Sequence, residues 1–290
     1  MNRVTVLAPG KLNLTLDVTG VAENGYHTLD MIMQSVSLAE RVIVRRSGEL
    51  RLRLPGSFVP ANESNTAYKA ALVFFRETGL LAGADITVKK AVPVRAGMAG
   101  GSADAAAVLV GLNELYGAKL SKAELCELGM QVGADVPFCI VGGTARVTGV
   151  GDILEPLPLC PPCFFTVCMP KGGISTPQAY ARYDELGTDA RPDGDAAAGA
   201  VRAGDLDGLC AQMVNALEFS SGSPANRPIE EILRSCGAKA ALMTGSGAAV
   251  FGVFTQREAA DEAKARLLRH YPRAWVVRPV ARGAHVVESN

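Results

Sequence analysis

The chain is poor in the residues that mark metal-binding, nucleic-acid-binding and membrane proteins. It holds only 3 histidines and 1 tryptophan among 290 residues, and its 29 lysines and arginines balance 29 aspartates and glutamates. With a net charge of zero, the chain has no excess of basic residues that would favour binding to nucleic acid or to an anionic membrane. No apolar run reaches the roughly 20 residues that a membrane helix needs, and the N-terminal segment turns polar too early for a secretory signal. We therefore expect a cytoplasmic protein with no nucleic-acid and no membrane partner.

The 7 cysteines are odd in number and scattered through apolar stretches. Cys160 and Cys163 form a C-P-P-C pair, which fits either a redox pair or half of a zinc site. No second pair of this kind and no histidine pair with metal-ligand spacing accompanies it. We favour cytosolic thiols packed as small hydrophobic side chains, and we expect no metal site built by the protein alone.

Composition and length indicate a globular α+β protein with two compact lobes. Hydrophobic residues make up 48% of the chain and charged residues 20%, as in ordinary globular proteins. The proline cluster at 156–162 predicts a boundary between a first lobe, 1–155, and a second, 156–290. In the second lobe a strand, turn, strand, helix and strand over 238–277 indicate a ferredoxin-like sandwich. The Ala/Gly/Asp-rich stretch 186–208 before it is expected to be a mobile loop with a short helix.

The first lobe begins with alternating strand patterns. Strands are predicted at 4–8, 11–17, 31–38, 41–46, 50–54 and 85–90, and helices at 66–77, after 102 and after 121. Pro9-Gly10 is expected to bend the chain between the first two strands. Within 11–17 the leucines share one face, and Lys11, Asn13, Thr15 and Asp17 share the other. A row of four polar side chains is either solvated or lines a site, and the pattern alone leaves both open.

The most informative feature is the glycine-rich segment 93–104, P-V-R-A-G-M-A-G-G-S-A-D, between a predicted strand and a helix. Its glycines let the backbone approach a ligand, and the helix start offers unpaired N–H groups, which together suit a polyphosphate. Ser102 can cap the helix or bind a phosphate oxygen or magnesium. Asp104, in the predicted first turn, can stabilise the helix dipole or hold a metal. The spacing differs from GxxxxGK[ST] and from GxGxxG, so a plain helix-capping loop stays open as the alternative.

Two other segments accompany this loop, A-P-G-K-L-N-L at 8–14 and M-T-G-S-G-A-A-V-F-G at 243–252. The three segments, in this order, resemble the three motifs of the GHMP kinase superfamily, which includes galactokinase, homoserine kinase and mevalonate kinase. The resemblance implies a two-lobed GHMP kinase fold with an N-terminal ribosomal-protein-S5-like lobe and a C-terminal ferredoxin-like lobe. It also implies an enzyme that uses ATP with Mg²⁺ to phosphorylate a small molecule.

Further segments narrow the resemblance within the superfamily. G-Y-H-T-L at 25–29 and V-G-A-D-V-P-F at 132–138, with weaker support from 176–180 and 215–218, are similar to members that phosphorylate the 2-hydroxyl of cytidine diphosphate-linked methylerythritol. These members serve the non-mevalonate route to isoprenoid precursors. Two alternatives stay open, namely a GHMP kinase for a sugar, homoserine or mevalonate-type alcohol, and a non-catalytic sensor with a decayed kinase fold. As for assembly, a monomer or a weak homodimer is expected.

The resemblance also implies roles for individual residues. Asp135 would be the general base or an orienting acceptor for the hydroxyl, and Lys11 would keep it ionised and stabilise the transferring phosphoryl group. ATP would lie on Pro93, Val94, Arg95, Ala96, Gly97, Met98, Ala99, Gly100, Gly101, Ser102, Ala103 and Asp104, with Asn65 and Lys89 near its adenosine. The acceptor would lie on Asn13, Tyr26, His27, Tyr180, Gly245, Ser246 and Gly247, with the two tyrosines offering aromatic faces to cytosine and the histidine reading its edge.

Each assignment has a simpler alternative. Asp135 and Asn65 precede helices and suit N-caps, Lys11 could be a solvated strand lysine, Tyr180 a packing residue, and Gly245–Gly247 a plain hairpin turn. The loop also departs from the usual G-G-G-S-S of the superfamily, because alanine stands at 99 and 103. Alanine disfavours positive φ, so ordinary dihedrals are predicted at Ala99. The missing hydroxyl at 103 removes one phosphate contact but leaves the backbone donors.

Overall fold

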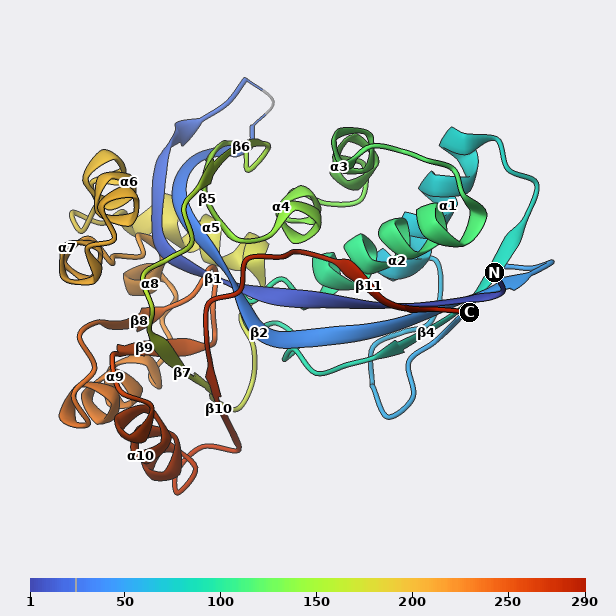
Figure 1. The fold of residues 1–290 in the computed structure, drawn as a ribbon. Helices are drawn as coiled ribbons and strands as arrows, with labels where there is room; N and C mark the ends of the chain where they lie inside the picture. Colours follow the sequence, from blue (N-terminus) through green and yellow to red (C-terminus); the bar gives the residue numbers. More distant parts are fainter. Residues whose placement is uncertain (24) are drawn as a thin grey trace.

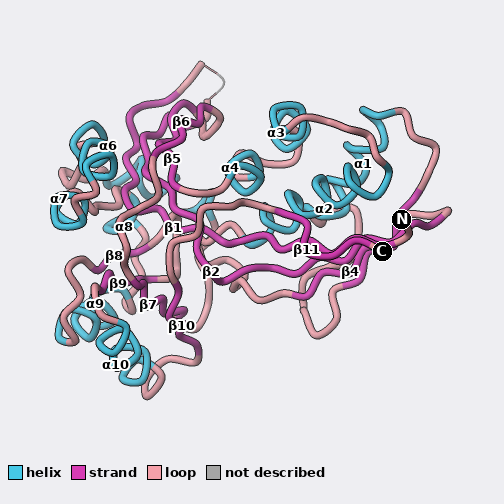
Figure 2. Tube along the Cα trace, in the orientation of Figure 1, coloured by secondary structure: helices cyan, strands magenta, loops and turns pink. Residues whose placement is uncertain are grey.

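The computed structural model describes residues 1–23 and 25–290, which form a seven-stranded and a four-stranded sheet with helices against both (Figure 1). The strands are β1 (Arg3–Val21), β2 (His27–Ser47), β3 (Arg51–Arg53), β4 (Gly83–Lys89), β5 (Thr144–Gly149), β6 (Ile153–Leu157), β7 (Phe164–Met169), β8 (Ala241–Met243), β9 (Val250–Phe254), β10 (Arg273–Val277) and β11 (His285–Ser289). The helices are α1 (Thr66–Thr78), α2 (Gly100–Tyr116), α3 (Lys122–Met130), α4 (Val136–Val141), α5 (Thr176–Leu186), α6 (Gly194–Ala203), α7 (Leu206–Ala211), α8 (Leu217–Ser220), α9 (Asn226–Ser235) and α10 (Arg257–Leu267). Figure 2 shows α1, α2 and α3 at one end of the molecule and α6, α7, α9 and α10 at the other.

The long antiparallel pair of β1 and β2 runs through both halves of the molecule (Figure 1). The breaks predicted at Pro9-Gly10 and between 38 and 41 are wrong, because both strands continue across them. Instead the register shifts between Pro9 and Lys11, and such a bulge accommodates a proline, which lacks a backbone N–H, without ending the strand. A Cβ at Gly10 would lie 3.2 Å from the Met98 carbonyl oxygen. Gly10 therefore lets β1 pass directly beside the glycine-rich loop.

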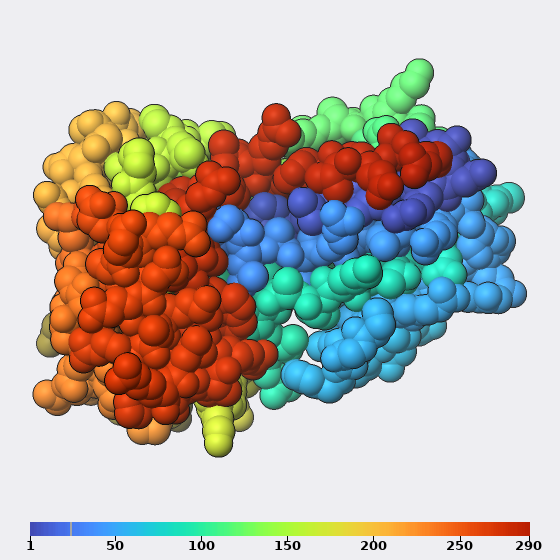
Figure 3. All heavy atoms as spheres, turned by 60° about the horizontal axis from the view of Figure 1, so that its bottom comes forward, coloured from blue at the N-terminus to red at the C-terminus, as the bar shows by residue number. Residues whose placement is uncertain are grey.

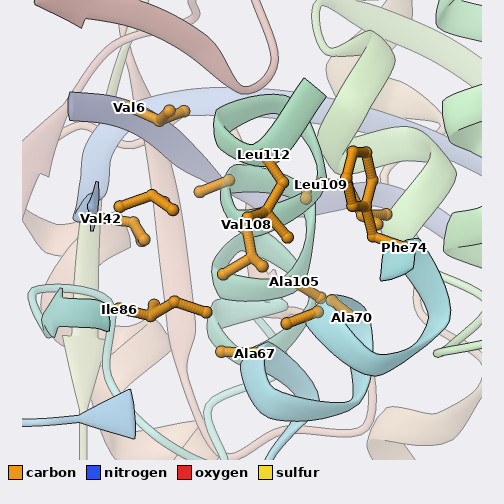
Figure 4. Close-up of a cluster of buried hydrophobic side chains, with 14 of the residues drawn as sticks. Val6, Val42, Ala67, Ala70, Phe74, Ile86, Ala105, Val108, Leu109 and Leu112 are labelled. Carbon is orange, nitrogen blue, oxygen red and sulfur yellow. The ribbon is translucent and has the colours of Figure 1, made fainter. Parts of the chain in front are cut away.

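The core of the larger sheet fixes the start of α2. Val6, Val42 and Ile86 of the sheet face α2, and α1 packs on its other side with Ala67, Ala70 and Phe74 (Figure 4). A Cβ at Gly111 would lie 2.9 Å from a methyl group of Val44, so the helix lies close to the strands. This close packing determines where the N-terminus of α2, and the loop that leads into it, meets β1.

The smaller sheet has the order β10-β7-β9-β8 with every pair antiparallel. Together with α9 and α10, this order is the ferredoxin-like arrangement predicted from 238–277. The stretch 186–208, predicted as a mobile loop with a short helix, contains that helix as α6 and, in addition, the start of α7. Asp193 caps α6, and the alanines of its inner face are buried in the core with Val201. Burial of these alanines stabilises the helix, which the Ala/Gly/Asp-rich composition alone did not make evident.

The end of the chain returns to the beginning. β11 pairs antiparallel with β1, and Figure 3 shows the last residues lying along the first strands. The last strand thus belongs to the larger sheet, and the division of the chain at residue 155 stays a prediction. Among the described residues, none of the helices has the length and apolar character required to cross a membrane.

Candidate active site

The loop that leads into α2 has an unusual backbone. Arg95, Gly97 and Ala99 have positive φ of 55°, 73° and 56°, and Ala99 is the N-cap residue of α2 in the left-handed conformation. The prediction of ordinary dihedrals at Ala99 is therefore wrong, although this conformation costs a non-glycine residue roughly 1–2 kcal/mol. Tertiary packing imposes it. A Cβ at Gly97 would lie 2.0 Å from the Thr244 carbonyl oxygen, so the loop has to turn tightly between that contact and the helix.

The predicted turn at 244–247 closes against this loop. Gly247 N–H donates to the Thr244 carbonyl at 3.0 Å, which completes the turn. Just beyond it, Ala248 N–H donates to the Arg95 carbonyl and Ala249 N–H to the Ala96 carbonyl, both at 3.3 Å. The C-terminal motif therefore supports the glycine-rich loop through its backbone.

β1 completes the junction of the three motifs. Lys11 N–H donates to the Met98 carbonyl at 3.1 Å, and Asn13 N–H donates to Thr244 Oγ1 at 2.9 Å. Segments that are far apart in the sequence thus meet at one place through hydrogen bonds that the β1 backbone donates. The glycines at 97 and 245 make this approach possible, because a Cβ at Gly245 would lie 3.0 Å from the Gly97 carbonyl oxygen.

Lys11 and Asp135 meet at this junction. The Lys11 ammonium donates to Asn13 Oδ1 and lies 3.9 Å from Asp135 Oδ2. Lys11 is 4% exposed, so it is not a solvated strand lysine. Asp135 directly precedes α4 but makes no side-chain cap hydrogen bond, and its side chain is 38% exposed. The capping alternative fails, and the carboxylate stays accessible beside a buried cation.

The polar face of β1 is buried along its whole length, with Lys11, Asn13, Thr15 and Asp17 all 9% exposed or less. Thr15 Oγ1 accepts from Ile32 N–H at 2.9 Å, and Asp17 pairs with Arg191. These two residues hold the fold together. Lys11 and Asn13 are the part of the face that reaches the junction.

A buried charge cluster beneath the loop was missed by the sequence analysis. Lys90 Nζ lies 2.5 Å from Glu40 Oε1 and 2.7 Å from Asp104 Oδ2, and it reaches the Gly100 carbonyl at 3.4 Å. Burial raises the pKa of Asp104 to about 7, against the opposing effect of the Lys90 charge. Asp104 lies in the second turn of α2, past the predicted first turn, and faces a lysine. Lys89, which was predicted to reach ATP, is exposed on β4, and strand alternation turns its neighbour inward.

Asn65 caps α1, as its simpler alternative suggested. Its Oδ1 accepts from Ala67 N–H at 2.9 Å, and its Nδ2 donates to the Pro60 carbonyl at 2.7 Å. The next residue, Thr66, donates from Oγ1 to the Gly101 carbonyl at 2.7 Å. The start of α1 is thus tied to the first turn of α2, and a contact of Asn65 with adenosine stays a prediction.

A second group of side chains lies where β2 meets α5. The rings of His27 and Tyr180 stack with centroids 4.6 Å apart, and Tyr183 meets His27 edge-on at 6.5 Å. His27 Nε2 lies 2.7 Å from Asp184 Oδ1, whereas the Tyr26 side chain is largely exposed. Tyr180 therefore presents one ring face to His27 rather than to a ligand, and burial raises its pKa. Asp184 was missed, and its position four residues after Tyr180 on one helix was the available signal.

Polar contacts tie the turn at 244–247 to the helices around it. Ser246 Oγ and Thr176 Oγ1 lie 2.9 Å apart, which joins the turn to the start of α5. Asn215 donates from Nδ2 to the carbonyls of Met243 and Gly245, at 2.9 and 2.8 Å. These contacts explain why the segment 215–218 accompanies the C-terminal motif.

In the part of the chain that the structure describes, no group of three or more His, Cys, Asp and Glu side chains is placed to hold a metal ion. Cys160 and Cys163 are free and buried in a hydrophobic cluster. They pack as the small hydrophobic side chains that were favoured for them.

Comparison with known proteins decides the family. The family of GHMP kinases N terminal domains matches residues 65–143, and that of GHMP kinases C terminal domains matches 197–273. A 4-diphosphocytidyl-2-C-methyl-D-erythritol kinase of Exiguobacterium sibiricum is 44% identical over 255 residues, which are 86% of this chain and 88% of that protein. The chain belongs to the 4-diphosphocytidyl-2-C-methyl-D-erythritol kinase family.

Other members of this family agree. The kinase of that name from Alkaliphilus metalliredigens is 37% identical over 286 residues, 97% of this chain and 98% of that protein. A crystal structure of a 4-(cytidine 5'-diphospho)-2C-methyl-D-erythritol kinase superposes with a TM-score of 0.79 at 32% identity, covering 95% of this chain and 99% of that one. The predicted GHMP kinase fold and the prediction of an ATP-using small-molecule kinase are confirmed.

Proposed function

We propose that the protein transfers the γ-phosphoryl group of ATP to the 2-hydroxyl of 4-diphosphocytidyl-2-C-methyl-D-erythritol, giving ADP and the 2-phosphate. The observation that carries the proposal is the Lys11–Asp135 pair, 3.9 Å apart at the junction of the three motifs. The names of the relatives support the choice of acceptor. The product would enter the non-mevalonate route to isoprenoid precursors.

The roles of the two residues follow from their surroundings. The Asp135 carboxylate is accessible and lies beside a buried ammonium, so it can accept the proton of the acceptor hydroxyl or orient that hydroxyl. Lys11 is held by Asn13 Oδ1 and by the β1 backbone, so its positive charge is preorganised for the transferring phosphoryl group. Phosphoryl transfer depends mainly on positioning and charge neutralisation because its transition state is loose.

ATP is assigned to the loop 93–99 and the first turn of α2. The N-terminus of this 17-residue helix presents unpaired N–H groups and the positive end of its dipole. The left-handed residues keep the backbone in a tight turn in front of that helix end. Asn65 and Lys89 remain predicted contacts of the adenosine portion.

Magnesium is proposed to enter with ATP. The Ser102 hydroxyl in the first turn of α2 and the exposed Asp135 carboxylate are oxygen donors of the kind that Mg²⁺ accepts, and phosphates and water can complete its shell. Asp104 suits the ion less well, since it is 3% exposed and its Oδ2 faces Lys90. When bound, the ion supplies neutralisation of phosphate charge.

The acceptor is assigned to the other side of the junction. His27 and Tyr26 would receive the cytosine, and Asn13, Gly245, Ser246 and Gly247 would lie along the remainder of the molecule. Stacking of a base on an aromatic side chain contributes about 1–3 kcal/mol. Cytoplasmic location and a monomer or weak homodimer stay predictions.

The test is the variant Asp135→Asn, with Asp261→Asn on the exposed face of α10 as the matched control. Loss of a general base lowers turnover by roughly 10²–10⁴-fold, while both ligands should still bind in calorimetry. Near-wild-type turnover in Asp135→Asn would remove this residue from the mechanism. A substrate panel tests the acceptor: phosphorylation of mevalonate or homoserine, with none of the cytidylyl compound, would overturn the proposed function.

A further inference from the structure

The His27 imidazole is held on three sides by residues of α5. Tyr180 stacks on one face with an interplanar angle of 22°, Tyr183 meets it edge-on at 86°, and Asp184 Oδ1 lies 2.7 Å from Nε2. The helix itself is anchored, since Thr176 Oγ1 lies 2.9 Å from Ser246 Oγ at the turn beside the glycine-rich loop. These contacts fix the orientation of the His27 ring and make Asp184 the hydrogen-bond partner of its Nε2.

The partner determines the tautomer. A neutral imidazole carries one N–H, and an ionised carboxylate can only accept a hydrogen bond. The hydrogen therefore lies on Nε2 and is donated to Asp184, which leaves Nδ1 as an acceptor without a hydrogen. In the described part of the chain the His27 ring makes this one hydrogen bond, so Nδ1 keeps its lone pair without a hydrogen-bond partner there.

An acceptor at Nδ1 distinguishes the two pyrimidines. Cytosine presents an N4 amino group, a donor, where uracil presents an O4 carbonyl, an acceptor. The Nδ1 lone pair can accept from the amino group but repels the carbonyl oxygen. If Nδ1 carried the hydrogen, the preference would be reversed.

We propose that Asp184 is a positioning residue that holds His27 in its Nε2–H tautomer and thereby makes the kinase select a cytosine over a uracil acceptor. The proposal rests on the proposed function in one respect, namely that the base lies at His27. Asp184 acts only through His27 and has no role at the transferring phosphoryl group. It should therefore govern which base is accepted, and hence KM, more than kcat.

The first test compares a cytidine diphosphate-linked acceptor with its uridine analogue in wild type, Asp184→Ala and Asp184→Asn. A hydrogen bond that discriminates between bases gives roughly a 5- to 150-fold preference, so the cytidine-to-uridine ratio of kcat/KM should fall by at least about 5-fold in both variants. The fall should arise mainly from a raised KM for the cytidine compound. Glu185→Gln removes the same charge from the neighbouring exposed position and should leave the ratio unchanged. An unchanged ratio in folded Asp184→Ala overturns the proposal.

The second test reads the tautomer directly and needs no turnover. The chain has only 3 histidines, so two-bond ¹⁵N–¹H correlations of the rings can be assigned with single His→Gln variants at 270 and 285. The wild-type His27 ring should show the hydrogen on Nε2, and Asp184→Ala should show a mixture of both tautomers. A hydrogen on Nδ1 in the wild type refutes the proposal. If the wild type fails to phosphorylate the cytidine compound, the proposed function falls, but the tautomer and the relative affinity for CDP and UDP still decide the role of Asp184.

Discussion

The Lys11 ammonium lies 3.9 Å from the Asp135 carboxylate, and the two side chains differ sharply in exposure, 5% against 38%. The cation belongs to a long strand and is enclosed by backbone. The anion stands at the start of a short helix and faces solvent. This difference in exposure gives the two residues different roles. The fixed ammonium of Lys11 can neutralise charge on the transferring phosphoryl group, whereas the accessible carboxylate of Asp135 can contact the acceptor hydroxyl.

Lys11→Met should reduce turnover and should also lower stability by about 1–3 kcal/mol, because the buried Asn13 Oδ1 loses its hydrogen-bond donor. Removal of a preorganised charge that stabilises the transition state costs about 10²–10³-fold in kcat. Loss of the ion pair itself should cost little stability, because the half-exposed Asp135 carboxylate can be hydrated without Lys11. The measurement is steady-state kcat together with urea unfolding, with the exposed Lys122→Met as control. Turnover of Lys11→Met within a few-fold of the control would contradict the assignment.

Lys90→Met should destabilise the protein severely, and Lys89→Met should not. The first change leaves Glu40 and Asp104 buried without their cation, and breaking a buried ion pair in this way costs about 3–5 kcal/mol. The second changes an exposed side chain and should stay within about 0.5 kcal/mol. The free energies of unfolding in urea compare the two.

A second set of substitutions tests whether the loss of stability in Lys90→Met comes from the unpaired charges of the two carboxylates. Adding Glu40→Gln and Asp104→Asn to Lys90→Met removes the stranded carboxylates and should restore part of the lost stability. Equal stability of Lys90→Met and Lys89→Met, or a triple variant weaker than the single one, would refute the charge argument.

Ala99→Gly should stabilise the protein, whereas Ala103→Gly in the same helix should weaken it. Relief of the left-handed strain at Ala99 gains roughly 1–2 kcal/mol, partly offset by the greater entropy of glycine in the unfolded chain, about 0.4–1 kcal/mol. The net gain should be about 0.5–1 kcal/mol. Ala103 is buried within α2, and glycine there should cost about 1 kcal/mol or more. Thermal or urea unfolding measures both, and a loss of stability in Ala99→Gly would count against the strain.

Glu218 should make the fold less stable as pH rises. Burial, with a contribution from the neighbouring Glu230, raises the pKa of Glu218 to about 9 from an ordinary 4.5. Between these values the folded state keeps a proton that the unfolded chain releases, so the free energy of unfolding falls with pH, by at most about 1.4 kcal/mol per pH unit. Glu218→Gln should flatten this slope, because the amide stays neutral and its oxygen can still accept from Met243 N–H.

The measurement is urea unfolding at several values between pH 5 and pH 8.5. Glu231→Gln, on the exposed face of α9, is the control and should follow the wild type. Parallel pH profiles for wild type and Glu218→Gln would show that Glu218 titrates normally.

Local patterns predicted much of the architecture because they depend on near neighbours. A helix forms after residue 121 as predicted, and the capping box of Ser121 and Glu124 begins it; Gly117 ends α2 in the left-handed conformation. The ferredoxin-like order and the turn at 244–247 also follow from the sequence. Long-range packing overrode local preference at Pro9, where a bulge replaces the expected bend. It also made 186–208 more helical than the one short helix expected there.

The sequence by itself determined the family, the three motifs and the pair Lys11 and Asp135, because these rest on residue types in order along the chain. Only the tertiary structure decided which side chains from distant segments lie next to each other. It placed Lys90 between two carboxylates, turned Ala99 left-handed against a tight loop, and set Asp184 on the Nε2 side of His27. Each of these depends on contacts between segments far apart in the chain, whose distances and burial no local pattern encodes.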